Sequence, residues 1–388
     1  MTGGNGDMKR HGRTILTAAT AVALSAALAG PALAAAPAHT SGGHDGTRQA
    51  VRAAVVGGVP GVVARVQRGH GTWAATAGVG NLETGKPRST RDHYRVASIT
   101  KTFVATVVLQ LEAEGRLSLD DTVEKWLPGV VHGNGHDGSR ITLRQLLNHT
   151  SGIFDVTADE DVQRAYFTED GFYRVRYDTV TPERILGIAM SHEPDFEPGT
   201  SWNYSNTNYV LAGMLIEKVT GHPYGDEIRR RIINPLHLEE TSVPGTRATL
   251  PRPSSRAYSK LARTATGPTY DVTELNPSIA GASGEMISDS ADLNRFYSAL
   301  LRGRLLPPEQ LKEMRTTVPT KENEAYGLGL RSYELSCGTT VWGHGGDIHG
   351  SHSKALTTAD GRHSLALNFN GDWTGDSDAI VEAEFCGK

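Results

Sequence analysis

Residues 96–101 read Val-Ala-Ser-Ile-Thr-Lys, and they lead directly into the apolar run Thr102–Leu109. This run predicts a buried helix with Ser98 and Lys101 near its first turn. A spacing of three residues places both side chains on one helix face, close enough to share a proton. The unpaired N–H groups and the positive dipole end suit an oxyanion there and disfavour a protonated amine. Ser98 is therefore a candidate nucleophile beside a neutral Lys101, although a helix cap followed by a surface lysine has the same pattern.

The length and charge of the chain narrow the possible classes of protein. Its 388 residues are enough for one large domain or two. The composition is that of a globular protein, and the formal net charge is −4. Because no strong positive field is present, we expect no nucleic-acid partner.

The N-terminal residues have the features of a secretory signal peptide. Lys9, Arg10 and Arg13 precede an apolar run from Thr14 to Leu28, and small residues follow up to Ala34 and Ala36. We predict a signal peptide at residues 1–34 and a flexible leader at residues 35–46. The strongly apolar part is shorter than the roughly 20 residues that span a bilayer. We therefore expect a secreted, extracellular protein with no stable membrane anchor.

The chain has two cysteines, Cys337 and Cys386. An even number in an exported protein favours one disulfide bond. Two buried free thiols or a pair of metal ligands are the alternatives at this point.

The order of the expected elements predicts an α+β fold. A helix at 48–56 precedes strands at 62–67 and 73–77, and the chain ends with four strands and a helix, at 327–335, 339–343, 353–358, 364–369 and 378–385. Between them we expect a loop at 132–139 and a helix that begins at residue 181. Further helices are expected at 118–128, 142–149, 206–219, 226–233 and 290–301. Strands at both ends predict one antiparallel sheet flanked by helices, with an inserted helical lobe and a site in the groove between them.

Two further motifs carry side chains suited to catalysis. Tyr204 and Asn206 lie just before and at the start of an expected long helix, where Tyr204 could carry protons and Asn206 could bind a carbonyl group. The third motif, His344-Gly345-Gly346-Asp347, follows a strand, and its glycines allow a backbone to approach a ligand closely. Taken singly, the first motif reads as a turn with an N-cap and the second as a turn.

Taken together, the motifs Ser-x-x-Lys, Tyr-x-Asn and His-x-Gly resemble those of the serine penicillin-recognising enzymes. This family contains class C β-lactamases, DD-peptidases and related esterases. The resemblance spans nearly the whole mature chain and includes the segments 146–152, 204–209, 327–330 and 341–344. Histidine in the third motif is most similar to the secreted D-alanyl-D-alanine carboxypeptidases of the family. The resemblance implies a single β-lactamase-like catalytic domain at 47–388, with a sheet lobe at about 47–125 and 280–388 and a helical lobe at about 126–279.

The resemblance also implies roles for individual residues. Ser98 is the nucleophile, Lys101 and Tyr204 are jointly the base and proton shuttle, and Asn206 holds the substrate amide. His344 supplies the electrostatics that a lysine usually provides in the third motif. The roles for substrate binding fall on Arg331, which matches the residue that binds a terminal carboxylate, and on Gly345, Gly346 and Asp347. The backbone N–H groups of Ser98 and Asp347 form the oxyanion hole, and Cys337 pairs with Cys386.

The expected activity is that of a D-alanyl-D-alanine carboxypeptidase that forms an acyl-Ser98 intermediate and is acylated by β-lactams. The alternatives are a β-lactamase, a D-amino-acid-specific peptidase, an esterase and a catalytically silent binder of cell-wall peptides. Asp347 stands where the carboxypeptidases have a hydroxyl residue, and a carboxylate there repels a substrate carboxylate. A zinc site formed by His344, His349 and His352 with Asp347 is a weaker alternative. We expect a monomer without a cofactor, and a D-Ala-terminated peptide or a β-lactam as its ligand.

Overall fold

The structure, a computed structural model, describes residues 43–262 and 266–387. The described residues from His44 onward group as one compact unit. The expected signal peptide and most of the expected leader lie outside the described residues, while the last leader residues already belong to helix α1 (Asp45–Val56). None of the helices in the described ranges is long and apolar enough to cross a membrane.

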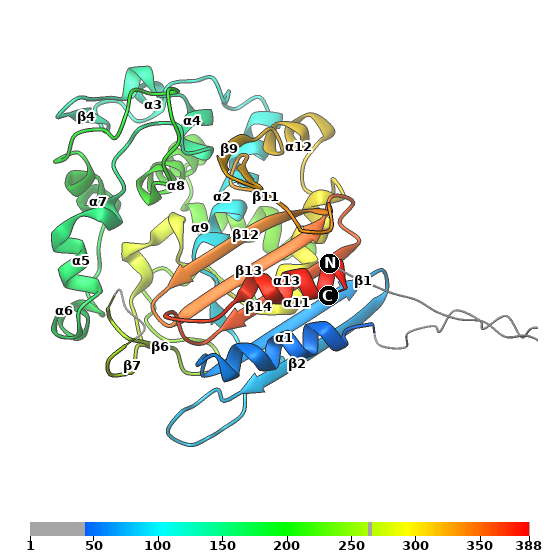
Figure 1. The fold of residues 1–388 in the computed structure, drawn as a ribbon. Helices are drawn as coiled ribbons and strands as arrows, with labels where there is room; N and C mark the ends of the chain where they lie inside the picture. The colour runs from blue at the N-terminus through cyan, green and yellow to red at the C-terminus, as the bar shows by residue number, and fades with distance from the viewer. Residues whose placement is uncertain (1–42, 263–265, 388) are drawn as a thin grey trace, which may run out of the picture. The chain divides into compact units, whose positions relative to one another are not determined.

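One eight-stranded antiparallel sheet organises the unit (Figure 1). Its strand order is β2-β1-β14-β13-β12-β11-β10-β9. The strands are β1 (Gly61–Arg68), β2 (Gly71–Gly78), β9 (Val318–Lys321), β10 (Glu324–Tyr326), β11 (Arg331–Glu334), β12 (Thr340–Ile348), β13 (Ser351–Thr358) and β14 (His363–Phe369). Strand β1 pairs with β14 from Val62 opposite Phe369 to Arg68 opposite His363. The N- and C-terminal strands therefore share one sheet, which confirms the predicted fold class.

Both faces of this sheet are covered by helices. Helices α1 and α13 (Ser377–Cys386) pack together on one face, and α11 (Ser290–Leu301) packs on β1, β13 and β14. Strand β1 shows why: Val62 and Val66 belong to the core that contains residues of α1 and α13, whereas Val63 belongs to the core that contains residues of α11. Since neighbouring strand residues point to opposite faces, the apolar stretch 62–64 of β1 is buried on both sides of the sheet.

Helix α2 (Thr100–Ala113) is buried over most of its length. Every side chain from Thr100 to Leu109 is buried, and the helix contacts α8 (Asn206–Thr220), α9 (Tyr224–Ile228) and α12 (Pro308–Met314). An apolar run without a polar face suits such a position, because solvent reaches no side of it. The prediction of a buried helix after Ser98 is confirmed.

The central third of the chain is mainly helical. Its helices are α3 (Val123–Trp126), α4 (Leu143–Leu147), α5 (Glu160–Tyr166), α6 (Glu169–Val175), α7 (Pro182–Ala189) and α10 (Asn234–Leu236), besides α8 and α9. Local signals set several of their ends: Thr142 and Gln145 form a capping box at α4, and Thr181 caps α7 before Pro182. The short strands pair as β3 (Tyr94–Arg95) with β8 (Ile287–Ser288), β4 (His132–Gly133) with β5 (His136–Asp137), and β6 (Tyr258–Ser259) with β7 (Tyr270–Asp271).

Several expected elements differ from the structure. The helix expected at 118–128 is only the short α3, and the loop expected at 132–139 contains the β4–β5 pair. Helix α12 and strands β9 and β10 were not predicted, because their sequences are short and polar. The segment His344–Asp347 lies inside β12 instead of forming a turn, since β13 pairs with it residue by residue.

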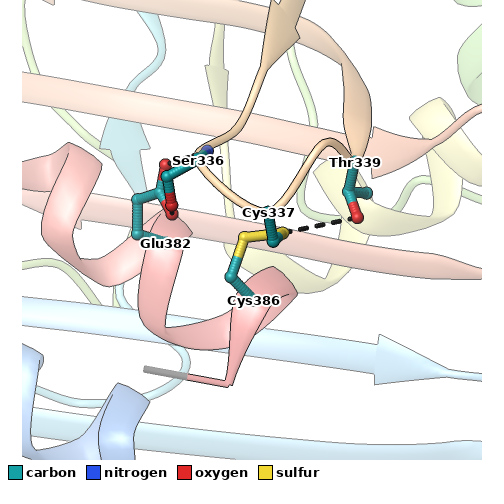
Figure 2. Close-up of a disulfide and its surroundings, with 5 residues drawn as sticks. All are labelled: Ser336, Cys337, Thr339, Glu382 and Cys386. Carbon is teal, nitrogen blue, oxygen red and sulfur yellow. Dashed lines mark hydrogen bonds between the residues drawn. A yellow bond between two sulfur atoms is a disulfide. The ribbon is translucent and has the colours of Figure 1, made fainter.

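The predicted disulfide joins Cys337, in the turn between β11 and β12, to Cys386 at the end of α13 (Figure 2). The two Cα atoms are 5.7 Å apart. Beside the bond, the Ser336 backbone N–H donates to Glu382 Oε1 over 2.9 Å. The bond therefore fastens the C-terminal helix to the sheet at the turn that leads into β12.

We expect the double variant Cys337→Ser/Cys386→Ser to be less stable than the wild type by roughly 2–4 kcal/mol, because the bond closes a loop of 49 residues in the unfolded chain. Urea unfolding of the variant and of the oxidised and reduced wild type measures this. Equal midpoints for all three samples would contradict the stabilising role.

Strand β12 touches the turn that carries Ser98. Residues Ala97–Ile99 form a short 3₁₀ helix, η1, which contacts both β12 and β13. A Cβ atom added to Gly346 would lie 2.2 Å from the Val96 carbonyl oxygen and 2.8 Å from the Ser98 backbone nitrogen. At Gly345 the nearest atom would be 3.5 Å away, which is an ordinary contact. Only the second glycine of the motif is therefore required by the close approach.

We expect Gly346→Ala to lower the free energy of unfolding by about 1–3 kcal/mol, because β12 must move away from η1. The matched variant Gly345→Ala is expected to change it by less than about 1 kcal/mol. Urea unfolding of both variants checks the difference. Equal stabilities would show that β12 has room to move at this point.

Candidate active site

Ser98 and Lys101 lie together at the start of α2. Lys101 Nζ is 3.1 Å from Ser98 Oγ, 2.8 Å from Asn206 Oδ1 and 2.7 Å from the Ser283 carbonyl oxygen. Ala97, directly before Ser98, has φ 49°, in the left-handed region that side chains rarely adopt. At this sharp turn Ala97 and Ser98 line a cavity, while Ile99 is fully buried.

The surroundings of Lys101 favour an uncharged amine. The side chain is fully buried, and burial lowers its pKa well below the usual value, against an opposing effect of Asp155. A neutral amine has two N–H groups and one lone pair. Carbonyl oxygens can only accept, so Asn206 and Ser283 take the two N–H groups. The lone pair then remains for the Ser98 hydroxyl proton.

Asn206 connects Lys101 to Asp155. Its Oδ1 accepts from Lys101, while its Nδ2 lies 3.3 Å from both carboxylate oxygens of Asp155, and its backbone N–H donates to Asp155 Oδ1 over 3.1 Å. These contacts fix which end of the amide faces Lys101. In this state the amide N–H groups point to Asp155, so the expected role of Asn206 in holding a substrate amide stays a proposal.

Tyr204 lies over the same group of side chains. Lys101 Nζ is 4.8 Å from the centre of its ring, and the ring of His149 is 4.3 Å away. Burial raises the pKa of Tyr204 far above its usual value, and the nearby Ser98 hydroxyl opposes this effect only in part. The hydroxyl is buried and has no hydrogen bond of normal geometry within the described ranges. Tyr204 is therefore a protonated phenol at neutral pH, able to give a proton but not to accept one.

His344 is buried and faces Tyr326. Its Nε2 is 2.9 Å from the Tyr326 hydroxyl, and its Nδ1 lies against the carbonyl oxygen of Gly345. The carbonyl oxygen requires an N–H at Nδ1, so Nε2 accepts from Tyr326. Burial, followed by Arg331, lowers the pKa of His344 well below its usual value. A neutral ring does not carry the positive charge of a lysine, and the role of His344 that the resemblance implies stays a prediction.

Arg331 is the cation next to Tyr204. Its guanidinium carbon lies 5.4 Å from the centre of the Tyr204 ring and 5.1 Å from that of Tyr326. Its Nη1 donates to Glu324 Oε2 over 3.2 Å. The guanidinium is thus already paired, and Arg331 is not one of the described residues that line the cavity in front of Ser98.

That cavity has a volume of about 390 Å³. Ser98 and Asn206 line it together with apolar side chains and two acidic residues. The apolar lining includes Val162, Tyr166, Phe167, Leu275, Ile279 and Ile348, and the acids are Asp347 and Asp372. A larger cavity of about 500 Å³ lies elsewhere, between residues 80–92 and 249–256, and contains none of the predicted catalytic residues. The cavity at Ser98 is large enough for a small amide or peptide terminus.

Some neighbours of Ser98 and Lys101 could not be identified from the sequence. Asp155, His149 and Tyr326 contact the catalytic candidates from separate parts of the chain, and Ser283 does so only through its backbone oxygen. His149 also accepts a hydrogen bond from the Ser205 backbone at 3.2 Å. This bond joins the segment that contains Tyr204 to the residues directly after α4. The family-like segment 146–152 was the only sequence signal that pointed to this region.

Chemically, the arrangement combines a serine, a neutral buried amine and a protonated phenol at the edge of a mostly apolar cavity. That combination suits attack of Ser98 on a carbonyl group followed by protonation of a leaving group. In the described ranges no three His, Cys, Asp or Glu side chains gather in a way that could hold a metal ion.

Solved structures similar to this chain include a D-stereospecific amidohydrolase and a D-amino acid amidase. A D-stereospecific amidohydrolase from Streptomyces sp. is 61% identical, with a TM-score of 0.85 over 89% of this chain and 99% of that chain. D-amino acid amidase from Ochrobactrum anthropi SV3, in complex with D-phenylalanine, is 29% identical, with a TM-score of 0.76 over 89% and 99% of the two chains.

Curated relatives include penicillin-binding proteins. Penicillin-binding protein 4* of Bacillus subtilis (strain 168) is 27% identical over 322 residues, which are 79% of this chain but 66% of that protein. Protein flp of Staphylococcus aureus is 36% identical over 154 residues, 28% of its length. This chain thus matches only part of the length of these relatives.

The family model described as Beta-lactamase matches residues 47–383, which include all the catalytic candidates. Together with the eight-stranded sheet and its helices, this match shows that the chain belongs to the beta-lactamase family, whose members also include penicillin-binding proteins.

Proposed function

We propose that this protein is a serine hydrolase that cleaves amide bonds of D-amino-acid substrates through an acyl-Ser98 intermediate. The observation that carries the proposal is the contact between Ser98 and a buried Lys101 whose N–H groups are taken by two carbonyl oxygens. The choice of D-configured amides is supported by the amidohydrolase at 61% identity and by the D-amino acid amidase.

In the proposed acylation, the Lys101 lone pair takes the Ser98 proton while Oγ attacks the substrate carbonyl carbon. The backbone N–H groups of Ser98 and Asp347 stabilise the resulting oxyanion. Tyr204 gives its proton to the leaving nitrogen and is reprotonated by the Lys101 ammonium. Water then attacks the acyl-enzyme, its proton returns to Ser98 through Lys101, and the acid product leaves.

The expected carboxypeptidase activity on D-Ala-terminated peptides is a second candidate, together with acylation by β-lactams. Its support is Arg331, which lies beside Tyr204. Glu324 already pairs with Arg331, and the acids of the cavity repel a substrate carboxylate. We therefore place this activity second to amide hydrolysis at a D-amino acid. Secretion and the monomeric state remain predictions from the sequence.

Ser98→Ala is expected to abolish both ammonia release from D-phenylalaninamide and the mass increase of an acyl-enzyme with benzylpenicillin. Without Oγ, no ester can form at position 98. Enzymatic ammonia assay and intact-protein mass spectrometry measure the two effects. If Ser98→Ala hydrolyses the amide as fast as the wild type, Ser98 is not the nucleophile.

Lys101→Met, which keeps the length of the side chain, is expected to reduce kcat/KM by roughly 10²–10⁴-fold, because the base is lost. The matched variant Lys125→Met removes an exposed lysine on α3 and is expected to have wild-type activity.

In the wild type, kcat/KM should fall as the pH falls through the lowered pKa of Lys101, because protonation removes the lone pair. An acidic limb near the ordinary lysine pKa of about 10.4 would contradict a neutral Lys101.

A further inference from the structure

The cavity in front of Ser98 contains several hydrogen-bond acceptors besides the catalytic candidates. The carboxylates of Asp347 and Asp372 line it together with the ring of His349, and no lysine or arginine is found in the described part of this lining. A cavity with such a lining favours a ligand that donates hydrogen bonds and carries positive charge.

Asp372 is the more buried of the two acids. It follows β14, and its Oδ2 accepts a hydrogen bond from the Gly350 backbone at 2.8 Å. Burial raises its pKa, and the negative charge of Asp347 adds to this effect. A hydrogen bond with the Ser259 side chain opposes this rise in part, and Asp372 has no ion pair with a lysine, arginine or histidine among the described residues. A carboxylate removed from water without a cation is costly, and a ligand cation would offset that cost.

His349 supplies an independent observation. Its Nε2 lies 2.7 Å from the carbonyl oxygen of Tyr166, which can only accept, so Nε2 carries the proton. Nδ1 is then a bare acceptor, and it is buried without a hydrogen-bond partner in the part of the chain that is described. The residue is 7% exposed, and its ring stacks on Phe167 at 4.9 Å. Burial lowers the pKa of His349 to about 4, so the ring stays an acceptor at neutral pH.

Asp347 is the third acceptor of the cavity, and it is the most exposed to solvent of the three. Its side chain is mostly exposed, and Oδ1 lies 2.6 Å from His352 Nδ1. His352 Nε2 in turn contacts Ser377 Oγ at 2.9 Å. These contacts hold Asp347 in place beside Ile348, which belongs to the apolar lining.

We propose that Asp372, Asp347 and His349 form a subsite for the protonated α-amino group of the substrate. The inference rests on the proposed function and narrows its substrate class to amides and peptides with a free N-terminal D-amino acid. The apolar lining from Val162, Tyr166, Phe167 and Leu275 would then hold the side chain of that residue. A substrate whose α-amine is acylated has no charge to bring to the two carboxylates, and this includes a D-Ala-D-Ala peptide, whose acyl-side nitrogen is an amide.

The test compares kcat/KM for D-phenylalaninamide and N-acetyl-D-phenylalaninamide. We expect the wild type to prefer the free amine by about 10–100-fold, the range for a hydrogen-bonded charge. Asp372→Asn should reduce this ratio by at least about tenfold, mainly through a higher KM for the free amine. The amide oxygen of asparagine can still accept from the Gly350 backbone, so this substitution is the mildest available. Asp347→Asn, at an exposed position, is the second variant and should reduce the ratio in the same direction.

The matched control is Asp360→Asn, which removes the same charge in the turn after the far end of β13 and should keep the wild-type ratio. An unchanged ratio in both Asp372→Asn and Asp347→Asn, or a wild type that prefers the acetylated amide, would overturn the subsite and leave the acyl-Ser98 proposal standing. If the wild type hydrolyses neither compound, the proposed function fails and the subsite fails with it.

Discussion

The contact between Lys101 and its three oxygen neighbours depends on burial. Water would keep the amine charged, whereas the interior removes that stabilisation and leaves two carbonyl oxygens to bind its N–H groups. The same burial keeps Tyr204 protonated and His344 neutral. Burial thus lowers the pKa of Lys101 and raises that of Tyr204, although the usual pKa values of lysine and tyrosine lie close together. It makes Lys101 a base and Tyr204 an acid.

The fold provides this burial by bringing distant segments to one place. The short helix η1 presents Ser98, the start of α2 presents Lys101, and the start of α8 presents Asn206. Strand β12 approaches η1 closely enough to require glycine at 346. The disulfide at the entry to β12 ties this strand region to the C-terminal helix. The elements η1, α5, α8 and β12 all contribute side chains to the cavity. Its lining contains both apolar and acidic residues.

The sequence predicted the sheet, the buried helix and the disulfide because each has a local or family-wide signature. Apolar runs identified β1 and α2. Each of the two cysteines in the sequence can form an intramolecular disulfide only with the other. Asp155 and Asp372 lie in irregular segments, and Ser283 ends the short 3₁₀ helix η6 (Gly281–Ser283). All three reach the site only through tertiary packing, so no spacing in the sequence marks them. The role of His344 stays a prediction, because the pKa of its ring is lowered by burial and by Arg331, which are properties of the folded chain.

The protonation state of Lys101 is the central claim, and it can be observed directly. Protein labelled with ¹³C at lysine Cε can be titrated by NMR, with the Lys101 resonance assigned by its absence from Lys101→Met. The account predicts that Lys101 has the chemical shift of a neutral amine at pH 7.5, while the exposed lysines have the shift of ammonium groups. A Lys101 resonance that stays at the ammonium position up to pH 9 would contradict it.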